Sequence, residues 1–221
     1  MQGRYSYVIR AGLGSLMAIA VATGQAEENH MAPTAALVEQ SSRELGNEID
    51  GIRSAAEQGV VQAQFSLGVC YQTGRGMKRD TALALEWFRK AAEQGLDEAQ
   101  YTLGCCFNGD DGFAQDAGEA VKWWGKAAAQ GYADAQFCLG LSYSIGQGVA
   151  KNPAQAAEWW NQAAAQGHDE AQYFLGLSYS TGNGVPKREE RAVYWLRQAV
   201  THGNKNAVAA LKQLGYEPSR G

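Results

Sequence analysis

The feature that most limits how this chain folds is a pattern that returns every 36 residues. Four segments of this length follow one another without gaps, at 63–98, 99–134, 135–170 and 171–206. Each begins with Ala-Gln, continues with Leu-Gly and an aromatic residue, and later carries a tryptophan. A fixed period of roughly 20–50 residues is typical of solenoids, in which each unit buries its apolar face against its neighbours. The sequence therefore predicts an all-α, right-handed solenoid of helix-turn-helix repeats.

Each unit contains two helical patterns separated by a glycine-containing turn. In the third unit, Ala135, Leu139 and Tyr143 form an apolar stripe at i, i+4 and i+8, which predicts the first helix. The turn contains Gly146 and Gly148, and polar residues that suit helix N-caps follow at Asp80, Asp116 and Asn152 of the first three units. The second helix carries apolar residues at i, i+3, i+4 and i+7, and the glycines expected to end it are Gly95, Gly131, Gly167 and Gly203.

The paired aromatic residues of the second helix recur in every unit, which favours packing over ligand binding. The first position is always tryptophan, and we expect core positions at Trp87, Trp123, Trp159 and Trp195. The next position varies in size, so we expect partly exposed core packing at Phe88, Trp124, Trp160 and Leu196. Glycines of the first helix, such as Gly104 and Gly140, are expected to let a neighbouring backbone approach.

The repeats resemble those of the Sel1-like family, relatives of the tetratricopeptide repeats. The fourth unit carries the family pattern at Ala171, Leu175, Gly176, Tyr179, Gly182, Gly184, Val185, Ala192, Trp195, Ala199 and Gly203. Residues 51–62 look like a partial repeat that caps the array, and 207–221 look like a C-terminal capping helix and tail. The resemblance implies adaptor, regulator or inhibitor roles. Exported relatives include immunity proteins against toxins, and cysteine-rich relatives have been associated with β-lactam binding.

The N-terminus has the order of a secretory signal peptide. Arg4 and Arg10 precede a short apolar run, and small residues follow at Gly24 and Ala26. We predict a signal peptide at 1–26, with cleavage after Ala22 as second choice, and a periplasmic or secreted protein. Residues 27–50 would then form a partly disordered or helical segment. The alternative is an N-terminal tail on a cytoplasmic protein.

The net charge, the spacing of the cysteines and the acidic turn argue against several functions. The formal net charge is -4, which disfavours nucleic acid as a partner. Cys70, Cys105, Cys106 and Cys138 do not fit disulfide spacing on stacked helices, so we predict four free thiols. The acidic turn 108–116 lacks the ligand order of a calcium loop. In that turn Asp110 stands where other repeats have glycine, so we expect a distorted turn. We predict no catalytic, cofactor or metal residues, and no enzyme.

Residues that vary between otherwise similar units are the candidates for specificity. On the first helices of the third and fourth units these are Cys138, Leu141, Ser142, Ile145, Phe174, Leu177, Ser178 and Thr181. We expect them to line a mildly apolar concave face that binds a helix, loop or peptide of another protein. The alternative is that several of them pack between repeats. The hypothesis is thus a protein-interaction scaffold or regulator in the cell envelope. The alternatives are a β-lactam-binding hydrolase, an immunity protein and a structural envelope protein, and the oligomeric state stays open.

Overall fold

The computed structural model describes residues 35–110 and 113–217, which form helices and no strand. In chain order the helices are α2 (Ala35–Glu57), α3 (Val61–Thr73), α4 (Thr81–Glu93), α5 (Asp97–Asn108), α6 (Ala117–Ala129), α7 (Ala133–Ile145), α8 (Pro153–Ala165), α9 (Asp169–Thr181), α10 (Glu189–Thr201) and α11 (Lys205–Gln213). The chain divides into two compact units, residues 1–51 and 52–221, and the boundary falls inside α2. The predicted signal peptide at 1–26 lies outside the described residues.

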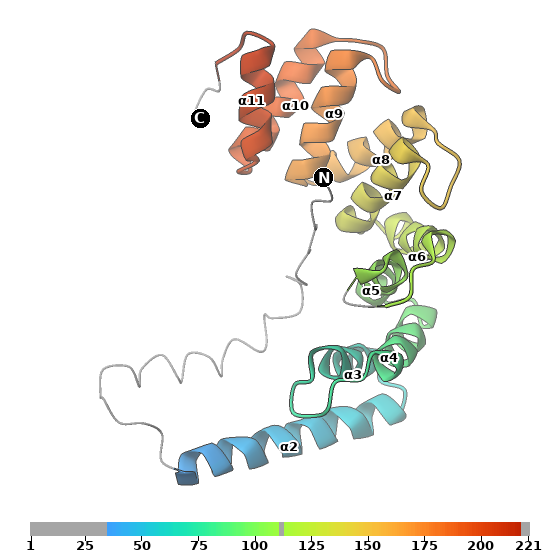
Figure 1. The fold of residues 1–221 in the computed structure, drawn as a ribbon, viewed down its shortest axis with the longest axis vertical. Coiled ribbons are helices and arrows are strands. Elements are labelled where there is room, and N and C mark those ends of the chain that lie inside the picture. Colours follow the sequence, from blue (N-terminus) through green and yellow to red (C-terminus); the bar gives the residue numbers. More distant parts are fainter. Residues whose placement is uncertain (1–34, 111–112, 218–221) are drawn as a thin grey trace. The chain divides into compact units, whose positions relative to one another are not determined.

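Within residues 52–221 the helices pair into hairpins that stack in chain order (Figure 1). The pairs are α3 with α4, α5 with α6, α7 with α8, and α9 with α10, and each second helix also packs on the next first helix. Each first helix begins two residues before the Ala-Gln pair, at positions 61, 97, 133 and 169. The predicted all-α solenoid of helix-turn-helix repeats is confirmed.

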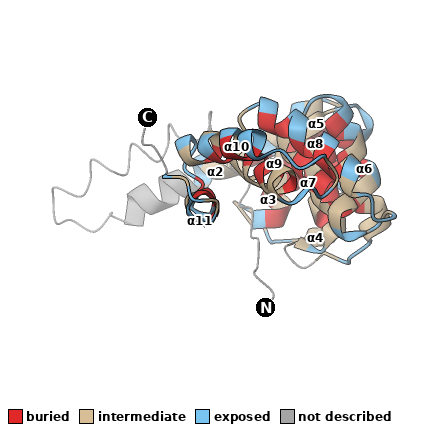
Figure 2. Ribbon diagram, turned by 90° about the horizontal axis from the view of Figure 1, so that it is seen from above, coloured by how far each residue is buried: buried red, intermediate tan, exposed pale blue. Residues whose placement is uncertain are grey.

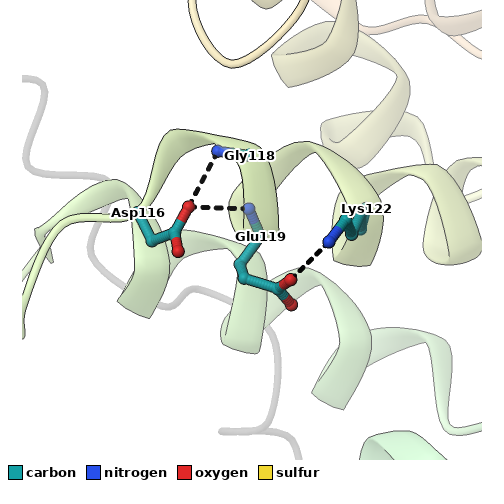
Figure 3. A network of polar contacts seen from close by, with 4 residues as sticks. All are labelled: Asp116, Gly118, Glu119 and Lys122. Carbon is teal, nitrogen blue, oxygen red and sulfur yellow. Dashed lines mark hydrogen bonds and ion pairs between the residues drawn. The ribbon is translucent and has the colours of Figure 1, made fainter.

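The second helices begin at the predicted N-caps. Asp80 accepts hydrogen bonds from two backbone N–H groups of α4, and Asp116 does the same for Gly118 and Glu119 of α6 (Figure 3). In α6 the carboxylate of Glu119 also pairs with Lys122 at 2.6 Å. Asn152 caps α8 through the N–H of Gln155. The fourth repeat differs, because Arg188 occupies the cap position of α10 and its side chain makes no cap hydrogen bond.

The acidic turn of the second repeat is distorted relative to the other repeats, as predicted. Helix α5 has 12 residues where the other first helices have 13, and it ends at Asn108. The residue in the left-handed conformation is Gly109, with φ of 95°, and it lies one place before the glycine of the other repeats. Asp110 is therefore not required to adopt the left-handed backbone, since ending the helix early leaves that conformation to a glycine.

The core corrects the predicted order of the aromatic pair. The second position is the more deeply buried one, with exposed fractions of 0% at Phe88, 6% at Trp124, 4% at Trp160 and 0% at Leu196. The first position is buried at Trp123 but half-buried at Trp87, Trp159 and Trp195. Figure 2 shows the buried residues gathered where helices meet. Core packing at the second position is therefore confirmed, whereas its predicted partial exposure is wrong. The first position belongs to the buried core at Trp123 and packs against it at Trp159 and Trp195.

The Leu-Gly motif of the first helix explains this order. A Cβ atom at Gly68 would lie 2.6 Å from the Phe88 ring, and one at Gly140 would overlap the Trp160 ring. The glycine therefore leaves room mainly for the second side chain of the aromatic pair, rather than for a neighbouring backbone as predicted. Adjacent helix positions point about 100° apart, so the first tryptophan is turned toward the surface.

A row of glutamine side chains joins each repeat to the next. The glutamine after the repeat's first alanine is buried, and its Nε2 donates to a backbone carbonyl of the preceding second helix. These bonds run from Gln64 to Ala56, Gln100 to Ala92, Gln136 to Ala128 and Gln172 to Ala164, at 3.0–3.2 Å. Their Oε1 atoms face Gln94, Gln130, Gln166 and finally His202, at 2.7–2.9 Å. We call this row the amide ladder.

Helices α2 and α11 flank the four repeats in the sequence. The last turn of α2 supplies Ala56, whose carbonyl accepts the first bond of the amide ladder. Helix α11 buries Ala207, Ala210 and Leu211, while its lysines Lys205 and Lys212 are exposed. The capping roles expected for 51–62 and 207–221 stay predictions. No helix in the described part of the chain is both long and apolar enough to cross a membrane.

Candidate protein-binding face

The candidate site is a stripe of residues along the first helices α7 and α9. In α7 the residues Asp134, Cys138, Leu141 and Ile145 follow one another at i, i+4, i+7 and i+11, so they share one side of the helix. In α9 the equivalent residues are Glu170, Phe174, Leu177 and Thr181. We call these eight positions the first-helix face.

The exposed residues of this face lie at its C-terminal end, and the others are half-buried. Ile145 has an exposed fraction of 65%, and Thr181 is also exposed. Leu141 and Leu177 are half-buried, and each packs on the core cluster of its own repeat. The predicted residues Leu141, Ile145, Leu177 and Thr181 thus lie at equivalent places on successive first helices.

The other predicted residues lie deeper between the repeats. The Phe174 ring stacks on Trp160 with centroids 5.1 Å apart and contacts Phe137 at 5.8 Å. Cys138 packs on the cluster around Trp124. Ser142 and Ser178 are buried, and each hydroxyl donates to a carbonyl four residues earlier on its own helix. These four side chains serve the packing of the stack.

Three carboxylates at the start of the first helices were not among the predicted site residues. Glu98, Asp134 and Glu170 occupy the same position in the second, third and fourth repeats, where the first repeat has Gln62. We call them the acidic row. They could have been found by comparing the repeats column by column, because an acidic side chain recurs at this position in three of the four repeats.

The environment of the acidic row leaves its charge poorly compensated. Burial and the neighbouring Asp97 raise the pKa of Glu98, and its Oε1 makes no hydrogen bond. Burial also raises the pKa of Glu170. Asp134 lies 3.2 Å from Nε2 of His168. The Nδ1 of that ring accepts from the N–H of Ala171, so Nε2 is the atom that donates to Asp134.

The aromatic residues on the second helices bind cations within the chain. The ammonium of Lys90 lies 3.8 Å from the ring centroid of Trp87, and that of Lys126 lies 3.7 Å from that of Trp123. Lysines one turn further along the helix therefore cover these rings. This arrangement gives the rings of the first two repeats a structural role.

The cysteines are free thiols, as predicted. Burial raises the pKa of Cys105 to about 12, and that of Cys138 well above its usual value. A thiol acts as a nucleophile or metal ligand in its thiolate form, so burial disfavours both kinds of chemistry here. Within the described part of the chain, no three His, Cys, Asp or Glu side chains gather as a metal site would need.

Comparison with known families assigns the repeats. The family model described as Sel1 repeat matches residues 61–96, 97–132, 133–168 and 169–204. The chain belongs to the Sel1 repeat family. Its Sel1 repeats begin two residues before the predicted ones, where the first helices begin. Sel1 repeat proteins generally mediate protein–protein interactions.

Two solved structures resemble this Sel1 repeat protein. A Sel1 repeat protein from Oxalobacter formigenes is 37% identical with a TM-score of 0.71, over 77% of this chain and 50% of that chain. A protective antigen present in uropathogenic Escherichia coli strains is 35% identical with a TM-score of 0.73, over 78% of this chain and 38% of that chain. The match thus spans half or less of each of those proteins. A search of curated proteins finds no match.

Proposed function

We propose that the chain is a non-catalytic interaction module that binds a partner protein on the first-helix face of the third and fourth repeats. The observation that carries the proposal is the exposure of Ile145, at 65%. The other repeats have Thr73, Gly109 and Thr181 at this position, so the packing of the stack does not require isoleucine there. Apolar side chains left exposed beside other apolar side chains are typical of binding surfaces.

The neighbours of Ile145 extend it into a patch. Leu141 lies one turn earlier on α7, and Leu177 occupies the position of Leu141 on α9. Both are half-buried, so each leaves part of its apolar surface in contact with solvent. A partner helix or loop that covers this patch would remove apolar surface from water without disturbing the core.

Two further features support the finer parts of this proposal. The basic and apolar residues of 1–26 support action in the cell envelope, because they have the order of a secretory signal. The raised pKa values of Cys105 and Cys138 support a non-catalytic role, because thiolate chemistry is disfavoured there.

Site-specific photocrosslinking in the native cells tests the proposal. A photoreactive amino acid replaces Ile145 in one variant and Tyr194 in the control. Tyr194 has an exposed fraction of 51% but lies on α10, a second helix. We expect a discrete crosslinked partner for position 145, which disappears when Thr181→Asp is added. Thermal melts check that each variant folds. Equal products at both positions, or none at 145, would contradict the proposal.

A further inference from the structure

We propose that the first-helix face accepts a segment that combines apolar with basic side chains, whose lysines or arginines lie against the acidic row of Glu98, Asp134 and Glu170. This inference rests on the proposed function, because it names the chemistry of the partner that the same face binds. It commits to a basic, amphipathic peptide segment of another protein.

The acidic row and the exposed apolar patch share one side of the first helices. Asp134 lies on the same stripe of α7 as Leu141 and Ile145, and Glu170 lies on the same stripe of α9 as Leu177. A segment that lies lengthwise along one of these helices therefore meets both its carboxylate and its apolar residues. The two features are independent, since one follows from exposure and the other from charge.

Within the described residues, no lysine or arginine forms an ion pair with Glu98, Asp134 or Glu170. The side chain of Asp134 is 49% exposed, and it accepts a hydrogen bond from Nε2 of His168. Elsewhere the chain does pair its carboxylates, as Glu119 does with Lys122. The row is therefore charge that a partner's cations can complement.

Helix stability alone does not account for the row. A carboxylate in the first turn favours a helix, because it lies near the positive end of the helix dipole. Asp97 and Asp169 already occupy the first turns of α5 and α9. The additional carboxylates of Glu98 and Glu170 are half-buried beside a like charge, and their pKa values are raised. They cost the folded chain free energy that a bound cation would recover.

Lysines beyond the C-terminal ends of α7 and α9 favour one orientation of the bound segment. Beyond the C-terminal ends of α7 and α9, the loops carry the exposed residues Lys151 and Lys187. The apolar patch thus lies between half-buried carboxylates and solvated lysines. A basic residue is attracted toward the acidic row and repelled from the loops, so the partner's cations are expected on one side of its apolar stripe.

Peptide selection tests whether segments that bind this face combine apolar with basic residues. A phage-displayed library of random dodecapeptides is selected on the full chain and counter-selected on the Ile145→Ser variant, which adds no charge. We expect the surviving peptides to combine apolar residues with lysine or arginine above their frequency in the starting library. Surviving peptides without that enrichment would overturn the inference and leave the proposed function standing. If no peptide depends on Ile145, both fail.

Neutralisation of the row supplies the second arm. The triple variant Glu98→Gln, Asp134→Asn and Glu170→Gln is compared with Glu86→Gln, Glu93→Gln and Glu158→Gln. The control removes the same charge from exposed residues of second helices. For a selected peptide, we expect the row variant to raise the Kd about tenfold at low salt and less at high salt, with little change in the control. Equal effects of the two variants would show a general charge effect and overturn the inference.

Discussion

Gly140 and Trp160 show how one small residue decides which of two adjacent rings is buried. A Cβ at Gly140 would overlap the indole, and the equivalent contact recurs between Gly104 and Trp124. The two tryptophans of each pair satisfy the same apolar spacing, so helical periodicity does not rank them. The ranking comes from the space that the facing helix leaves. The invariant Leu-Gly pair was visible in the sequence, but its contact was not.

Replacing this glycine should destabilise the fold. We expect Gly140→Ala to lower the free energy of unfolding by about 1–3 kcal/mol, because the added methyl group overpacks the Trp160 ring. The control is Gly125→Ala on α6, where a Cβ meets no atom within 4 Å. There alanine should raise stability by about 0.5–1 kcal/mol through helix propensity. Urea unfolding measures both. A gain in stability for Gly140→Ala would refute this account of the pair.

At the scale of the helix, the caps separate three repeats from the fourth. Asp80 and Arg188 have nearly the same backbone, with φ of -147° at both, but Asp80 alone accepts cap hydrogen bonds. The backbone conformation of a cap therefore survives without its side chain, because the stack around it holds the helix start. The long side chain of Arg188 lacks an acceptor for the first N–H groups of α10.

Installing the missing cap should strengthen the last complete repeat. We expect Arg188→Asp to raise the free energy of unfolding by about 1 kcal/mol, since an aspartate there accepts backbone N–H groups as Asp80 does. Arg188→Ala serves as the reference that removes the arginine without adding an acceptor. Calorimetry should give a higher Tm for the aspartate than for the alanine. The reverse order would show that Arg188 stabilises α10 by another contact.

The helices were more predictable than the site, for a physical reason. Repetition, the caps at Asp80, Asp116 and Asn152, and the helix-ending glycines are local signals, and the structure confirms them. The burial of Phe174 depends on contacts with Trp160 and Phe137 in the preceding repeat, and no local sequence pattern contains those contacts. Likewise, variability marked both Ile145 and Ser142, although one is exposed and the other is buried.

Across the whole stack, the amide ladder gives the boundaries between repeats the same pattern of hydrogen bonds, with His202 in place of a glutamine at the last one. Each boundary contains a buried glutamine that donates to one repeat and accepts from the next. Stability in such arrays is close to a sum of unit terms and nearest-neighbour terms. The ladder belongs to the second kind, because it joins a second helix to the first and second helices that follow it.

Replacing one buried glutamine of the amide ladder should weaken the coupling between neighbouring repeats. In Gln136→Leu, the Ala128 carbonyl loses its side-chain donor but keeps the N–H of Gly131, and the Gln166 amide loses one of its two acceptors but keeps the Gly131 carbonyl. We expect a loss of about 1–3 kcal/mol and a broader urea transition, as the halves of the stack begin to unfold separately. Gln62→Leu, at an exposed position on α3, is the control. A sharp transition, with the same urea dependence of the free energy of unfolding as the unchanged protein, would show that Gln136 does not couple the repeats.

The sameness of these boundaries has a consequence for how such a chain changes length. A unit of 36 residues inserted or removed as a whole leaves every remaining glutamine with the partners it already has. Gene duplication or deletion in that register therefore creates no new interface that selection must repair. The acidic row and the apolar patch are not copied into every repeat. A change in repeat number would thus alter the reach of the binding surface while its joints stay the same.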